Sequence, residues 1–261
     1  RLNREFYYLS RFSHKGIVAA LDYGSTAEHR PYFTMEYCDG VPINKHFVSG
    51  YAPGITDVTI QILSALDSIH AQGLIHCDLK PENILVLAEE DRLRAKLLDF
   101  GFAEKVALTD ATAPRGTLGY VAPEVFKGGD VDARADLYSL GITYYRMLTG
   151  KLPFTGKDAR EIMEKQVFDP PEPLHKLEPN LAPTIYYVMD RLLRKRPAER
   201  YPSATALIAD LERAIEEIHA GIQSNAPAAD NDKGSSAIRR STSRRDRPPK
   251  NTSNFLRKLF G

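Results

Sequence analysis

Two short polar motifs separated by a predicted β-hairpin constrain this chain more than any other feature. The first motif is HCDLKPEN at 76–83, and the second is DFG at 99–101. Between them, apolar runs at Ile84–Leu87 and Ala95–Leu98 flank a charged turn, Glu89–Arg94, so we expect a hairpin that brings the motifs together. Two carboxylates and an amide gathered in this way suit magnesium-assisted phosphoryl transfer. Oxygen ligands hold the metal on the phosphates, and a free carboxylate orients the attacking hydroxyl.

Each of these acids alone would usually be a surface charge or a helix cap, but their combination favours a catalytic site. The combination resembles the eukaryotic-type protein kinase family over roughly residues 1–219. This resemblance implies that Asp78 is the catalytic base and that Lys80 contacts the transferring phosphate. It also implies that Asn83 and Asp99 hold Mg²⁺ on ATP.

Three more residues resemble structural positions of that family. Ala122-Pro123-Glu124 is similar to the motif that closes the activation segment, and the resemblance pairs Glu124 with Arg200. Asp136 is similar to an aspartate on a central buried helix that anchors the catalytic loop. We therefore expect both acids to be buried with fixed partners.

The N-terminal region resembles the end of the small lobe of a kinase. In PYFTMEYCDG, at 31–40, the resemblance makes Met35 the gatekeeper and assigns adenine binding to backbone groups of Glu36 and Cys38. Glu5 lies nine residues before His14, about where the family has the helix glutamate that pairs with the ATP-binding lysine.

Lys80 and Thr117 resemble the serine/threonine branch of the family, with 116–124 as a platform for a peptide substrate. We thus expect transfer of the ATP γ-phosphate to a Ser/Thr hydroxyl of a protein. Two alternatives stay open at this stage. One is a pseudokinase or binding module that is inactive as it stands, and the other is a small-molecule phosphotransferase of related fold.

Two departures from the family pattern bear on these expectations. The glycine-rich loop and the strand lysine would precede Glu5, outside this chain, so we interpret it as a fragment of a longer kinase with further regulatory domains possible. Cys77 stands where the family usually has an arginine that receives an activation-segment phosphate. Without that arginine, phosphorylation has lost its main electrostatic receiver.

Charge distribution and cysteine content restrict the cellular location and the partners to be expected. Residues 233–261 hold nine Lys/Arg and one acid, whereas residues 1–232 hold 26 bases and 33 acids. The two cysteines imply no disulfide framework and favour a reducing, cytoplasmic location. No apolar run approaches the roughly 18–20 residues that a membrane span needs. We expect no nucleic-acid partner and no transmembrane segment.

The resemblance implies an α+β, two-lobed protein-kinase-like fold with an incomplete small lobe and an intact helical large lobe, and hydrophobic periodicity predicts its helices and strands. We expect a small-lobe remnant at 1–38, a helical lobe at 39–219 and a disordered basic tail at 220–261. The small lobe should hold a helix at 2–12 and strands at Ile17–Leu21 and Tyr32–Tyr37. The first large-lobe helix should start with Thr56 as its N-cap and stop at Gly73. Later helices are predicted at Ala135–Leu148, Ala159–Val167, Thr184–Leu193 and Ala204–Ile218.

Overall fold

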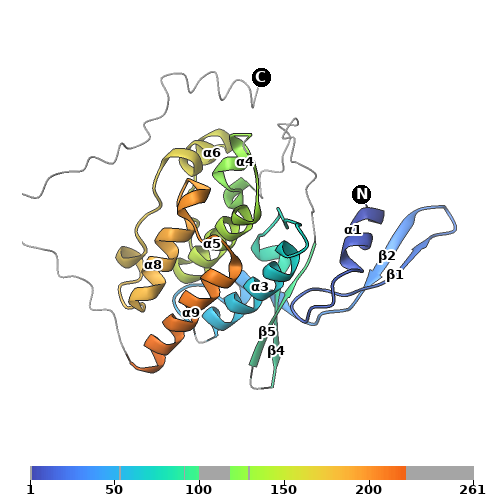
Figure 1. Ribbon diagram of the computed structural model, residues 1–261, viewed down its shortest axis with the longest axis horizontal. Coiled ribbons are helices and arrows are strands. Elements are labelled where there is room, and N and C mark those ends of the chain that lie inside the picture. Colours follow the sequence, from blue (N-terminus) through green and yellow to red (C-terminus); the bar gives the residue numbers. More distant parts are fainter. Residues whose placement is uncertain (1, 53, 91, 100–117, 129, 222–261) are drawn as a thin grey trace, which may run out of the picture.

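The computed structural model describes residues 2–52, 54–90, 92–99, 118–128 and 130–221. Its strands are β1 Ala20–Ser25, β2 Pro31–Met35, β3 Val41–Pro42, β4 Ile84–Glu89 and β5 Arg92–Leu97. Its helices are α1 Leu2–Leu9, α2 Ile43–His46, α3 Ile55–His70, α4 Pro123–Phe126, α5 Ala133–Thr149, α6 Ala159–Phe168, α7 Leu174–Leu177, α8 Pro183–Leu192 and α9 Ala204–His219. Short 3₁₀ turns lie at Pro81–Asn83, Leu118–Tyr120 and Pro197–Glu199. The predicted α+β class is confirmed, and Figure 1 shows the small N-terminal part beside a larger helical part.

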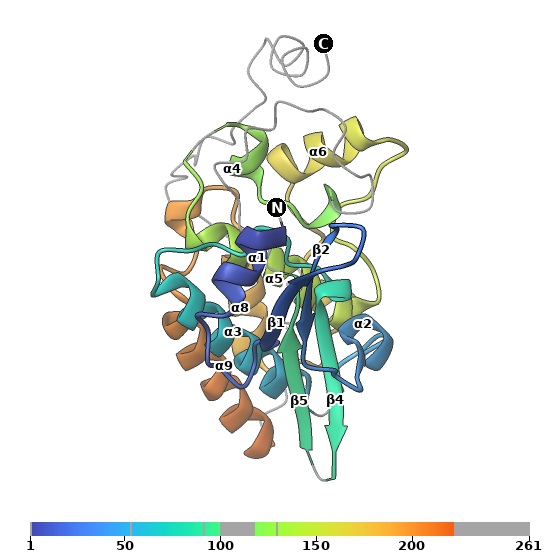
Figure 2. The same cartoon turned by 90° about the vertical axis from the view of Figure 1, so that its right-hand side faces the viewer.

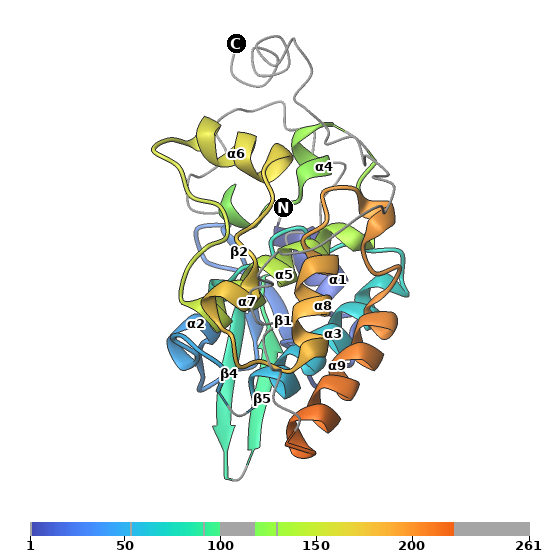
Figure 3. The same cartoon turned by 90° about the vertical axis from the view of Figure 1, so that its left-hand side faces the viewer.

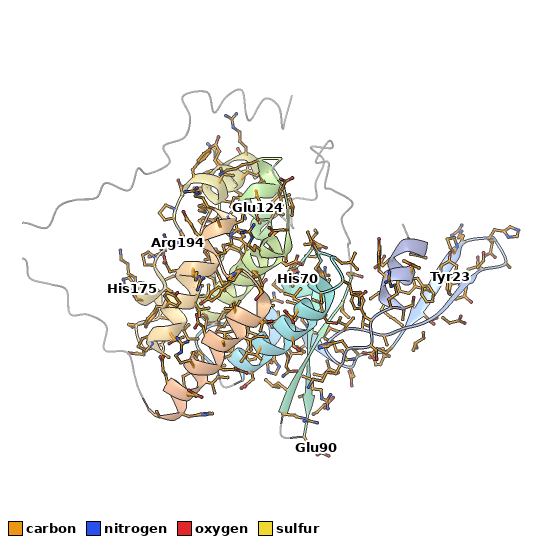
Figure 4. All side chains as sticks on the ribbon, viewed as in Figure 1. Tyr23, His70, Glu90, Glu124, His175 and Arg194 are labelled. Atoms are coloured by element: carbon orange, nitrogen blue, oxygen red, sulfur yellow. The ribbon has the colours of Figure 1, made fainter. Side chains whose placement is uncertain are left out.

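The small part consists of α1 packed on the antiparallel pair β1–β2. The Phe6 ring on α1 lies 5.4 Å from the Tyr23 ring and 6.0 Å from the Phe33 ring, measured between ring centroids. Tyr23 is labelled at this end of the molecule in Figure 4. The helix expected over 2–12 ends at Leu9, although Phe12 beyond it is still buried.

The strand predicted at Ile17–Leu21 begins too early. Strand β1 starts at Ala20, because Ile17 and Val18 pack against β5 instead of pairing with β2. The Leu97 backbone N–H donates to the Gly16 carbonyl at 2.8 Å, and the Val18 N–H donates to the Leu97 carbonyl at 3.1 Å. These bonds attach the small part to the strand that leads into Asp99, and Figure 2 views the molecule from the side of the small part, with α1 and β1 in front.

The hairpin β4–β5 is present as predicted, but its turn is shorter than expected. Both strands continue through the charged residues until Glu89 pairs with Arg92, and β3 pairs with β4 on the other side. Glu90 takes a left-handed φ of 40°. Charged side chains are compatible with these strands because Glu89 is exposed and Arg94 forms a salt bridge with it at 2.5 Å.

Helix α5 is the centre of the larger part. Nearly all its residues are buried, as expected for a helix that is covered all round. Figure 3 shows α3, α8 and α9 on one side of it, with α9 packed against both α3 and α8. The four later helices predicted for the larger part all form, and their ends differ from the expected residues by at most two positions.

The start of α3 corrects one prediction. Thr56 is not the N-cap, because the helix begins after Gly54, whose φ is 85°. Thr56 is 1% exposed, and its hydroxyl lies 3.1 Å from the Tyr144 hydroxyl and 3.2 Å from the Tyr51 hydroxyl. Its hydroxyl therefore bonds across the core to α5 instead of capping its own helix. At the other end α3 stops at His70, before the expected Gly73.

Candidate active site

The predicted catalytic residues meet in the loop that follows α3. Lys80 Nζ lies 2.7 Å from Asp78 Oδ2, and Asn83 Nδ2 donates to the Asp78 carbonyl at 2.9 Å and to Asp78 Oδ2 at 3.1 Å. The Asp78 side chain is 31% exposed. Within the described residues, Oδ1 of Asp78 accepts no hydrogen bond, so it can still accept one from a bound hydroxyl.

Asp136 on α5 holds this loop through hydrogen bonds, as the resemblance predicted. Its carboxylate is buried and accepts the backbone N–H groups of His76 and Cys77 at 2.8 and 2.9 Å. It also lies 2.8 Å from Nε2 of His70, which Figure 4 labels at the end of α3. The sequence analysis missed His70, and no local signal could have identified it because its partner lies 66 residues away.

Two non-glycine residues of the site have a left-handed backbone. Cys77 has a φ of 63° and Asp99 a φ of 46°. Such a conformation costs about 1–2 kcal/mol for an L-residue and persists only when its surroundings hold it. The hydrogen bond from Cys77 N to Asp136 supplies part of that restraint.

His76 connects the catalytic loop to the strand before Asp99. Its Nε2 lies 3.0 Å from the Leu98 carbonyl, which can only accept, so Nε2 carries the proton. Nδ1 then accepts the backbone N–H of Asp78 at 3.3 Å. Because the ring is fully buried, burial lowers the pKa of His76, against the opposing effect of Asp136.

We expect acid to destabilise the fold through this histidine. The unfolded chain takes up a proton near pH 6.5, whereas folded His76 binds it only at lower pH. Stability is therefore complete above pH 6.5 and falls as the pH drops below it. The slope is at most about 1.4 kcal/mol per pH unit for each such group. Burial also lowers the pKa of His14, which adds to the slope.

Urea unfolding followed by circular dichroism at pH 7.5 and pH 5.5 measures this loss. The variant His76→Gln can still donate to Leu98 but cannot titrate, so its stability should differ less between the two pH values. An equal pH difference in His76→Gln and the wild type would show that His76 does not carry the effect.

The proposed metal ligands are adjacent through the backbone. The Leu98 N–H donates to the Asn83 carbonyl at 2.8 Å, which places Asp99 one residue beyond this bond. Among the described residues, Asn83 Oδ1 accepts no hydrogen bond and the exposed Asp99 carboxylate has no hydrogen-bond or ion-pair partner. An amide oxygen and a carboxylate suit Mg²⁺, which typically takes one or two protein ligands together with phosphates and water. The donor set therefore fits the metal.

The predicted hinge residues, Glu36 and Cys38, lie in the segment between β2 and β3. Glu36 N–H donates to the Ala19 carbonyl at 2.9 Å, and Cys38 carbonyl accepts from Gly40 N–H at 2.9 Å. In the described part of the chain, the Glu36 carbonyl and the Cys38 N–H make no hydrogen bond, so both can contact the edge of a base. The Glu36 side chain forms an ion pair with Lys96 of β5, a contact that the sequence analysis missed.

Several predicted features cannot be placed. Phe100 and Gly101 of the second motif and the first two residues of the predicted platform, Gly116 and Thr117, lie outside the described residues, as does the tail from 222. Glu5 lies on α1, and its pairing role stays a prediction. No helix in the described ranges is long and apolar enough to cross a bilayer.

Glu124 and Arg200 form the predicted pair at the end of the platform. Arg200 Nη1 and Nη2 donate to the two Glu124 oxygens at 2.6 and 2.7 Å, with side-chain exposures of 0% and 8%. Comparison with family models then decides the family: residues 1–210 match the protein kinase domain. The chain belongs to the protein kinase domain family.

Curated relatives of this kinase domain include bacterial serine/threonine-protein kinases. The chain is 35% identical to Pkn1 of Myxococcus xanthus over 226 residues, covering 83% of this chain and 32% of that protein. It is also 35% identical to PknB of Mycobacterium tuberculosis over 239 residues, covering 87% of this chain and 37% of that protein. The kinase domain thus spans about a third of the length of these relatives.

Solved kinase structures confirm the predicted fold. The crystal structure of the Mycobacterium tuberculosis PknI kinase domain matches with a TM-score of 0.61 and 28% identity, over 82% of this chain and 78% of that chain. Rad53 1–466 in complex with AMP-PNP matches with a TM-score of 0.65 and 27% identity, over 79% and 53% of the two chains.

Proposed function

We propose that the protein is a serine/threonine protein kinase. The observation that carries this proposal is the arrangement around Asp78, whose carboxylate is held by Lys80 and Asn83 while its Oδ1 stays open. A carboxylate in this state can accept a proton from a hydroxyl that approaches it. The kinase relatives, which carry serine/threonine in their names, support the choice of acceptor.

The proposed reaction moves the ATP γ-phosphoryl group to a Ser or Thr hydroxyl. The acceptor oxygen forms a bond to the γ-phosphorus, the bond to the β-γ bridging oxygen breaks, and ADP leaves. The proton of the acceptor passes to Asp78. Lys80 places a positive charge beside the transferring group, and the adenine contacts backbone groups of Glu36 and Cys38. Asn83 and Asp99 would hold Mg²⁺, which would supply neutralisation of the phosphate charge.

The nucleotide assignment rests on chemistry and on likeness. Rad53, a similar solved structure, contains AMP-PNP. In this chain the open hinge groups and the oxygen donors of Asn83 and Asp99 could hold the base and the metal-bound phosphates, respectively. The cytoplasmic location, the domain boundaries and the expectation of no nucleic-acid partner stay predictions.

A phosphotransfer assay with the full-length protein tests the proposal. The protein is incubated with Mg²⁺ and γ-labelled ATP in the presence of a general Ser/Thr protein substrate, and the labelled amino acids are identified. We expect phosphoserine and phosphothreonine. Tight binding of ATP without any transfer would favour the pseudokinase alternative, whereas labelling of small metabolites alone would favour the small-molecule phosphotransferase.

A further inference from the structure

One charged residue interrupts the buried surface of the central helix. From Ala135 to Leu148 every residue of α5 is buried except Arg146, which is partly exposed. Ionised side chains in such surroundings usually have a partner of opposite charge. Asp136 accepts the backbone N–H groups of the catalytic loop and lies 2.8 Å from Nε2 of His70. Among the described residues Arg146 has no carboxylate partner, and so its guanidinium needs another explanation.

The contacts of Arg146 leave most of its hydrogen-bonding capacity unused. Its Nη1 donates to the hydroxyl of Tyr120, and in the described part of the chain no carboxylate lies within ion-pair distance of it. A guanidinium has five N–H donors in a planar fork. Tyr120 is 3% exposed and sits in the 3₁₀ turn Leu118–Tyr120, so it holds the fork in a fixed place.

This arginine lies beside the catalytic loop. The Glu82 carboxylate acts on the Tyr120 hydroxyl and contributes to raising the pKa of Tyr120, although burial has the larger effect. Glu82 belongs to the turn Pro81–Asn83, whose Asn83 bonds to Asp78. The charge of this turn therefore acts on the Tyr120 hydroxyl, to which Arg146 donates.

We propose that Arg146, oriented by Tyr120, binds an anionic side chain of the protein substrate near the acceptor Ser or Thr. This inference rests on the proposed kinase function and specifies the class of substrate. The ligand is a carboxylate of Asp or Glu or the phosphate of a phosphoserine, because both match the guanidinium fork with two parallel hydrogen bonds.

Glu82 supplies the competing possibility. Its carboxylate is exposed and has no hydrogen-bond or ion-pair partner among the described residues, so it could attract a basic substrate residue instead. Arg146 is the better-ordered of the two groups, because it donates a hydrogen bond to Tyr120 and lies among the buried residues of α5. A binding group that is already ordered loses less conformational entropy when the ligand arrives.

Peptide specificity in the full-length protein tests the proposal. A set of peptides shares one acceptor, and each flanking position is replaced in turn by Asp, Glu, phosphoserine, Ala or Arg. At one position we expect kcat/KM to be about tenfold higher with an acidic residue than with Ala. A still higher value with phosphoserine would identify previously phosphorylated proteins as the source of the anion.

Variants assign the preference to this residue. Arg146→Gln should reduce the acidic-to-alanine ratio to within about twofold of one, and Arg146→Glu should favour the Arg peptide. Tyr120→Phe should lower the ratio by releasing the guanidinium. Arg194→Gln is the matched control, since Arg194 is exposed on the surface, where Figure 4 labels it, and pairs only with the exposed Asp190 there. Its ratio should equal that of the wild type.

The possible failures are distinct. If the wild type phosphorylates no peptide of the set and no general protein substrate, the proposed function fails. If it phosphorylates the Ala peptides but shows no acidic preference, or prefers Arg, the inference about Arg146 is overturned while the kinase assignment stands. An acidic preference that Arg146→Gln retains also overturns it. If Arg146→Gln does not fold, the peptide scan of the wild type together with that of Tyr120→Phe still tests whether the acidic preference depends on Arg146.

Discussion

Replacing Asp78 with Asn should reduce phosphoryl transfer by the full-length protein by roughly 10²-fold or more. The substitution keeps the size of the side chain and its contact with Lys80, but it removes the negative charge and the proton acceptor at Oδ1. Initial rates with Mg²⁺, ATP and a Ser/Thr substrate measure the effect. ATP binding, which involves the hinge at Glu36–Cys38, should change little by comparison.

Asp190→Asn is the matched control for this prediction. The change is the same chemically, but Asp190 lies on the exposed surface of α8 with a side-chain exposure of 68%. We expect this variant to retain the wild-type rate. A rate for Asp78→Asn near that of the wild type would show that another group accepts the proton and that the assignment of the base is wrong.

Breaking the Glu124–Arg200 pair should strongly destabilise the described structure. Arg200 uses all five N–H groups: two donate to Glu124, and the others to the carbonyls of Arg194, Arg134 and Lys195 at 2.8, 3.0 and 3.1 Å. Its guanidinium carbon also lies 4.7 Å from the centre of the Tyr138 ring. Glu124→Gln leaves this buried cation without its counter-charge, which commonly costs about 3–5 kcal/mol.

Hydrogen exchange of the α5 amides in the full-length protein measures this loss locally. Glu124→Gln and Arg200→Leu should each lower their protection strongly, and the double variant should lose less than the sum of the two. The exposed pair Arg194–Asp190 serves as a control. Removal of this exposed pair should change the free energy of unfolding by about 1 kcal/mol or less. Additive effects of Glu124→Gln and Arg200→Leu would mean that the pair does not act as a unit.

Much of the helical part could be predicted from the sequence because its signals are local. Apolar residues at helical spacing predict α5, α8 and α9, and alternating turns and apolar runs predict the hairpin β4–β5. The active-site residues cluster in two motifs, so their grouping around Asp78 also followed from spacing. The pairs Glu124–Arg200 and Asp136 with the catalytic loop came from the likeness to a family, since no local rule connects such distant residues.

Other features depended on the tertiary structure, because they arise where distant segments meet. Thr56 is of a residue type that is preferred at N-caps, yet its hydroxyl forms a buried hydrogen bond with the hydroxyl of Tyr144, 88 residues away. Ile17 is of a residue type that favours strands, yet the backbone groups next to it form hydrogen bonds with Leu97. In the sequence Arg146 is an ordinary helix residue. Only the structure shows its hydrogen bond to Tyr120 and the burial of the neighbouring residues of α5. Local preference is worth at most about 1 kcal/mol per residue, so burial and long-range hydrogen bonds decide where the two disagree.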